Sequence, residues 1–69
     1  MTQKELSYLE DAIGHEDNII KICKQMTSSM EDEELISFIE DEIETHLTMK
    51  EKLINILEDN SNEWWIMYE

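Results

Sequence analysis

The chain has 69 residues, with 18 acidic and 5 basic side chains, a net charge of −13, no proline and one glycine. This charge argues against nucleic-acid binding, because no basic patch could release counterions, and no apolar run approaches the roughly 20 residues that a membrane-spanning helix needs. A single cysteine, Cys23, cannot form an internal disulfide, and with no visible signal peptide the chain is expected to be a cytoplasmic, nearly all-helical single domain.

A first helix is predicted from about residue 3 to residue 27. Thr2 and Glu5 have the spacing of a capping box, in which each side chain accepts a hydrogen bond from the other residue's amide. In alternating steps of three and four, the apolar series of this helix is interrupted by Glu16, close to the centre of the apolar face. Gly14 costs roughly 1 kcal/mol relative to alanine, and close approach of a neighbouring helix at that level would explain it.

A second helix is predicted from about residue 30 to residue 58, with Ser28 or Ser29 as its N-cap. Its first turn contains the four acids of residues 31–34, where the helix dipole favours negative charge. Because only a few residues then separate the two helices, we expect antiparallel neighbours. Residues 1–58 therefore form a helical hairpin, and residues 59–69 form an acidic and aromatic tail.

The second helix also carries polar residues on its apolar face. At about 100° per residue, His46 falls in the middle of the apolar arc and Glu42 lies just inside its edge. If the loop centres near Ser29, Glu16 lies 13 residues before it, and Glu42 and His46 lie 13 and 17 residues after it. With the same rise per residue in both helices, the three polar side chains are expected at nearly one height.

Two amphipathic helices cannot enclose a core alone, so the remaining apolar surface predicts a partner. The unpartnered residues are Tyr8, Ala12, Ile19, Ile22 and Met26 on the first helix and Ile36, Ile43, Leu47 and Ile54 on the second. A homodimer of hairpins that forms a four-helix bundle is the simplest solution. It would gather four carboxylates and two imidazoles, a donor set that suits iron, manganese or zinc.

The segments 8–16 (YLEDAIGHE) and 32–47 (DEELISFIEDEIETHL) resemble half-length ferritin-like proteins, such as encapsulated ferritins and short spore-coat-like proteins. The resemblance implies a homodimeric four-helix bundle with a di-iron site and possible ferroxidase activity. It makes Glu16 the first-helix carboxylate and His46 the second-helix histidine. The family pattern is Glu-x-x-His; here Ile43 occupies that glutamate position, so Glu42 would serve through a Glu-x-x-x-His spacing. His15 is a candidate outer ligand or hydrogen-bond partner.

Other interpretations of the same residues remain open. Glu16 and His46 could form a buried polar network that fixes helix register without metal. The chain could also be a small acidic inhibitor, adaptor or nucleic-acid mimic that occupies a basic groove on a partner. Trp64, Trp65 and Tyr68 could cover the open end of the bundle, or dock into a protein partner or shell. A structural coat or shell-cargo role is compatible with a metal site.

Overall fold

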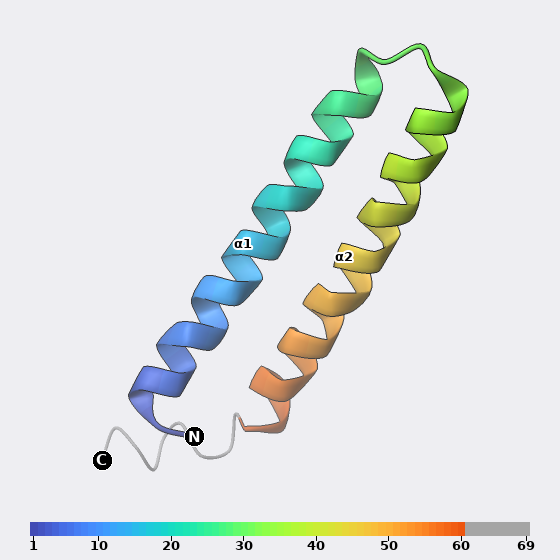
Figure 1. Ribbon diagram of the computed structural model, residues 1–69. Helices are drawn as coiled ribbons and strands as arrows, with labels where there is room; N and C mark the ends of the chain where they lie inside the picture. Colours follow the sequence, from blue (N-terminus) through green and yellow to red (C-terminus); the bar gives the residue numbers. More distant parts are fainter. Residues whose placement is uncertain (61–69) are drawn as a thin grey trace.

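The computed structural model describes residues 1–60; the aromatic tail with Trp64, Trp65 and Tyr68 lies outside the described residues. Two helices, α1 (Gln3–Ser28) and α2 (Glu33–Asp59), run antiparallel side by side and are joined by a short loop (Figure 1). Residues 1–60 contain no strand, which confirms the predicted all-α helical hairpin. Neither helix is long and apolar enough to cross a lipid bilayer.

The start of α1 is fixed by the predicted capping box. The Thr2 amide donates to Glu5 Oε1 at 3.0 Å, and the Glu5 amide donates to Thr2 Oγ1 at 3.0 Å. These contacts satisfy two backbone donors that the first turn of a helix leaves without partners. Two hydrogen bonds lower the pKa of the Glu5 carboxyl below its usual value. The larger effect comes from the bond with the Thr2 amide, and the smaller from the bond with the Thr2 side chain.

The start of α2 differs from the prediction, because neither Ser28 nor Ser29 caps it. The Ser28 hydroxyl donates to the Gln25 carbonyl at 2.7 Å, and the Ser29 hydroxyl donates to the Met26 carbonyl at 3.3 Å. Both serines therefore serve the last turn of α1, where carbonyls lack helical donors. Asp32 is the N-cap of α2 instead, since its carboxylate accepts from the Leu35 amide at 3.0 Å. The second helix starts three residues later than predicted.

The hairpin is a rod with a thin core. Its principal extents are 54 × 15 × 13 Å and its radius of gyration is 15.9 Å, whereas a compact domain of this length would have about 11 Å. In residues 1–60 the buried hydrophobic side chains are Leu6, Ile20 and Ile39, and no side chain is less than 2% exposed. The two helices thus shield only a narrow strip between them from water.

Gly14 has open space around it in the hairpin. A Cβ atom built at Gly14 meets no heavy atom within 4 Å beyond its own neighbours and helix backbone, and the residue is exposed. The expected close approach of a neighbouring helix is therefore wrong for the packing of α1 against α2.

Candidate functional site

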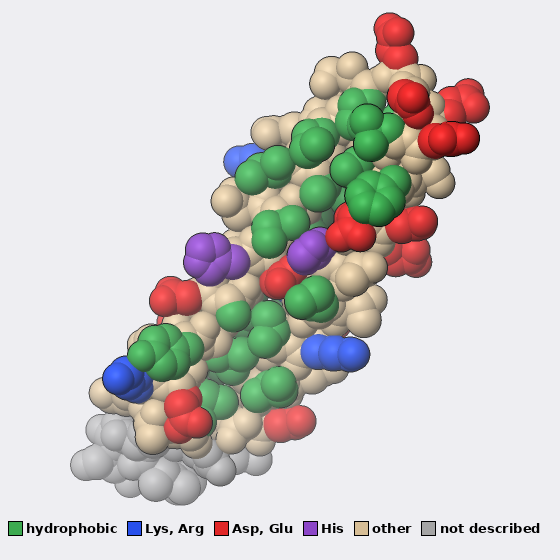
Figure 2. Space-filling model, in the orientation of Figure 1, with side chains coloured by type: hydrophobic (Ala, Val, Ile, Leu, Met, Phe, Trp, Pro, Cys, Tyr) green, Lys and Arg blue, Asp and Glu red, His purple; other side chains and the backbone are tan. Residues whose placement is uncertain are grey.

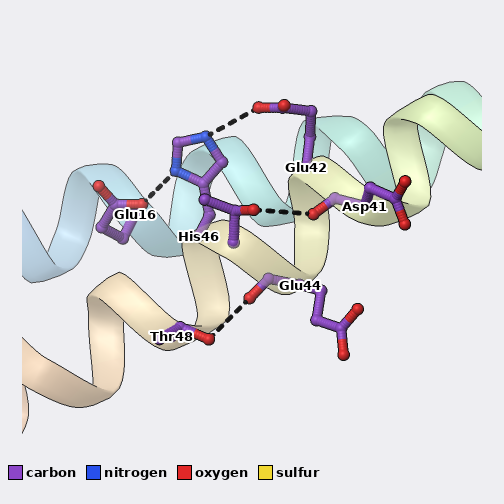
Figure 3. Close-up of polar contacts among 7 residues, drawn as sticks. Glu16, Asp41, Glu42, Glu44, His46 and Thr48 are labelled. Atoms are coloured by element: carbon purple, nitrogen blue, oxygen red, sulfur yellow. Dashed lines mark hydrogen bonds and ion pairs between the residues drawn. The ribbon is translucent and has the colours of Figure 1, made fainter.

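The candidate site is a contact between the two helices halfway along the rod. His46 Nδ1 on α2 lies 2.5 Å from Glu16 Oε2 on α1, with side-chain exposures of 21% and 12% (Figure 3). Glu16 is the one polar residue classed as buried in residues 1–60. Because burying an unpaired carboxylate costs several kcal/mol, the imidazole explains how α1 tolerates Glu16 in its apolar face. The predicted common height of Glu16 and His46 is confirmed.

The second ring nitrogen of His46 faces another carboxylate. His46 Nε2 lies 3.8 Å from Glu42 Oε2, one turn earlier on α2 (Figure 3), which is too far for a hydrogen bond. An ionised carboxylate only accepts hydrogen bonds, so with Glu16 ionised the donor in the short contact would be Nδ1–H of His46. In the neutral ring, Nε2 then has a free lone pair beside the half-exposed Glu42 carboxylate.

The neighbouring acids of α2 point elsewhere. The hydroxyls of Thr45 and Thr48 donate to the backbone carbonyls of Asp41 and Glu44 at 3.0 and 3.1 Å. In Figure 3 the carboxylates of Asp41 and Glu44 lie away from the imidazole, and only Glu16 and Glu42 are joined to it. The acids that face His46 are thus the two that the helical arithmetic singled out.

The ring sits between the two carboxylates, and this limits what one chain can bind. In residues 1–60, no three Asp, Glu, His or Cys side chains lie close enough together to hold a metal ion. Glu16 and Glu42 each contact a different nitrogen of His46, so they do not converge on one point. Within one hairpin, Glu42 therefore lies beside Nε2 of His46, while Glu16 contacts Nδ1 on the other side of the ring.

His15 is not brought into this arrangement. Its side chain is exposed on α1, about 100° around the helix from Glu16. Within residues 1–60 it makes no hydrogen bond or ion pair. The structure thus joins Glu16, Glu42 and His46 and leaves His15 apart from them.

The polar trio of Glu16, Glu42 and His46 lies on a face that the hairpin leaves open. At 100° per residue, Glu42, Met49 and Phe38 fall in that order within an arc of about 40° on α2. In Figure 2 hydrophobic side chains run along both helices, and a histidine with acidic neighbours interrupts them near the middle. The large hydrophobic residues exposed by 36–60% are Tyr8, Ile19, Ile22, Met26, Leu35, Phe38, Leu47, Met49 and Ile56.

A second polar contact between the helices was not predicted. Lys50 Nζ lies 2.5 Å from Asp17 Oδ1, so the residue after Glu16 binds the residue one turn after His46. A signal was present in the sequence, because Lys50 is four residues from His46 and shares its side of α2. Together the two contacts fix the register of α1 against α2.

The chain matches no known family model, and no curated protein or solved structure is detectably similar to it.

Proposed function

We propose that this chain is half of a metal-binding four-helix bundle, in which two hairpins pair through the open face and bind iron between them. The observation that carries the proposal is the polar trio: an imidazole whose Nδ1 is held by Glu16 and whose Nε2 faces Glu42, on an exposed apolar surface. Carboxylate and imidazole donors suit iron, manganese and zinc. The ferritin-like motif of the sequence supports the same assignment.

The position of the trio favours a two-fold pairing. Glu16 lies 13 residues after the start and 12 before the end of α1, and His46 lies 13 residues from either end of α2. Pairing two hairpins about a two-fold axis through the middle of the rod would bury the open face of each and bring their Glu42 and His46 side chains together. Two copies of Glu42 and His46 would then offer four direct donors, whereas one chain offers only two.

The contacts favour a positioning role for Glu16 rather than a role as a direct metal ligand. Histidines that bind metal usually donate their other N–H to a carboxylate, which fixes the ring and raises its basicity. Glu16 makes this contact with Nδ1, leaving Nε2 and Glu42 to meet the metal. Fe(II) bound at such a site would be oxidised by dioxygen or peroxide, as in ferroxidases.

The test is metal content by mass spectrometry after anaerobic Fe(II) loading, read with the mass in solution. We expect about one iron ion per chain in a dimer, and loss of iron in His46→Ala and Glu42→Gln. Glu44→Gln is the matched control for Glu42→Gln, since the Glu44 carboxylate lies away from the imidazole, and it should load as the parent protein does. A parent protein that takes up no iron, or an equal loss in this control, would refute the assignment.

Glu16 needs a separate pair of variants. Glu16→Ala should weaken iron binding about 10- to 100-fold, the usual effect of removing a group behind a metal ligand. Glu16→Gln should recover most of the affinity, because the amide oxygen still accepts from Nδ1–H. If Glu16→Gln loses iron as completely as His46→Ala, Glu16 is a direct ligand.

A second function is favoured by the loop end of the hairpin. Glu31, Asp32, Glu33 and Glu34 are consecutive and exposed there, in a chain of net charge −13. Such a surface suits a small acidic module that occupies a basic groove of a protein partner. Reversing the charges of Glu31, Glu33 and Glu34, which keeps the Asp32 cap, should then abolish partner binding and leave the metal content unchanged, whereas His46→Ala should leave partner binding intact.

A further inference from the structure

A groove on the side of the hairpin away from the polar trio holds most of the chain's positive charge. It has a volume of about 520 Å³, is formed by both helices, and is lined by Lys21, Lys24 and Lys50. The chain has five basic and 18 acidic residues; three of the basic residues and one of the acids, Asp17, line this groove. Its volume lies in the range of small-molecule sites.

Two of these lysines have no anionic partner in the hairpin. Lys50 pairs with Asp17 across the helices at 2.5 Å, whereas Lys21 and Lys24 form no ion pair with any other residue of the described chain. Asp17 also lines the groove, so the lining carries three positive charges and one negative charge, a net charge of +2. At physiological salt the remote acids are screened beyond about 8 Å, and the groove can attract an anion.

The rest of the lining is partly apolar. Ile20, which is buried, and Leu47 contribute its hydrophobic part, and Gln25 and Ser28 add polar side chains. An apolar wall beside two unpaired ammonium groups matches a ligand with an apolar body and an anionic head.

Acidic neighbours set a limit on the charge of that ligand. Glu44 and Glu51 lie three residues before and four residues after Leu47, on the same side of α2. They border the cationic groove without lining it, so a long polyanion would meet like charge on leaving it.

We propose that this groove binds a small amphiphilic anion, with its carboxylate or phosphate head on Lys21 and Lys24 and its apolar body against Ile20 and Leu47. At 100° per residue, Lys21 and Lys24 lie on the side of α1 away from Tyr8, Ile19 and Met26. The groove therefore stays open when a second hairpin covers the polar trio, and this site does not depend on the proposed iron binding.

The test uses decanoate, below the concentration at which it forms micelles, titrated into the ¹⁵N-labelled full chain and followed by amide chemical shifts. We expect saturable shifts centred on Ile20, Lys21, Lys24 and Leu47. Inorganic phosphate should bind at least tenfold more weakly because it lacks an apolar body, and decyltrimethylammonium should not bind there. If phosphate binds as tightly as decanoate, or the cation binds equally well, the amphiphilic anion is the wrong ligand class.

The chain provides a matched pair of variants. Lys21→Gln with Lys24→Gln should weaken decanoate binding at least tenfold, whereas Lys4→Gln with Lys52→Gln makes the same charge change outside the groove and should stay within twofold. Equal losses in both pairs would show general electrostatic attraction and overturn the site. Shifts centred elsewhere, or no saturable shift, would also overturn it.

Discussion

Glu16 and His46 stabilise each other in a place where neither could be buried alone. A carboxylate with 12% side-chain exposure and an imidazole with 21% retain some water, so the pair gains less than a dry ion pair would. Its value is therefore in register as much as in stability, since the contact is satisfied only when the middle of α1 faces the middle of α2. The same fixed geometry is what a metal site requires.

Gly14 is a position where a substitution should raise the free energy of unfolding. Its helical backbone and the empty space around an added Cβ mean that alanine fits without strain. Gly14→Ala should raise the free energy of unfolding by about 1 kcal/mol through a lower backbone entropy in the unfolded chain, measured by urea denaturation.

The control for this variant is Ser7→Ala, which replaces another exposed position of α1. It should change the free energy of unfolding by only a few tenths of a kcal/mol, because serine and alanine differ less in helix propensity than glycine and alanine do. A destabilised Gly14→Ala protein would mean that a second chain packs against this position, which is the close approach that the sequence predicts.

The sequence predicted the meeting of Glu16 and His46 because helical spacing fixes which face a residue occupies and at what height. It did not predict which ring nitrogen meets which carboxylate, because that depends on side-chain rotamers. It also missed the Asp17–Lys50 ion pair. The spacing of Lys50 from His46 indicates its side of α2, but which residue of α1 it meets depends on the lateral offset of the helices.

At the scale of the helices, the ends illustrate a competition among short polar side chains. Ser28, Ser29 and Asp32 are all good N-cap residues by type. The serines instead donate to carbonyls three residues earlier, which extends α1 and leaves Asp32 as the cap. The sequence predicted a short loop and two long helices correctly, but not the outcome of this local competition.

Asp32 and Ser29 can be compared directly. Asp32→Ala should lower the free energy of unfolding by about 1 kcal/mol, because the Leu35 amide loses its acceptor. Ser29→Ala should cost only a few tenths of a kcal/mol, since the 3.3 Å contact of its hydroxyl lies at an exposed helix end. Urea unfolding of both variants is the measurement, and a larger loss in Ser29→Ala would favour the N-cap predicted from the sequence.

At the scale of the whole molecule, the rod shape and the thin core make a single hairpin an incomplete unit. Nine large hydrophobic side chains of the described chain are at least 36% exposed, and small domains with so little buried surface usually need association or a metal. In our two proposals, the open face with the polar trio pairs with a second copy, and the lysine groove on the opposite side binds a small ligand.

Phe38 tests the first of these faces. Its side chain is 59% exposed in the hairpin, so Phe38→Glu changes the packing of α1 against α2 little, but it would bury a charge in the proposed interface. We expect the parent protein to have twice the 8.3 kDa chain mass in light scattering and a melting temperature that rises with protein concentration. Phe38→Glu should shift the mass toward one chain and lose iron binding with it.

Ser37→Glu adds the same charge about 100° away on α2 and should keep both properties. A Phe38→Glu protein that remains dimeric would place the interface on another face and remove the two-fold arrangement of Glu42 and His46.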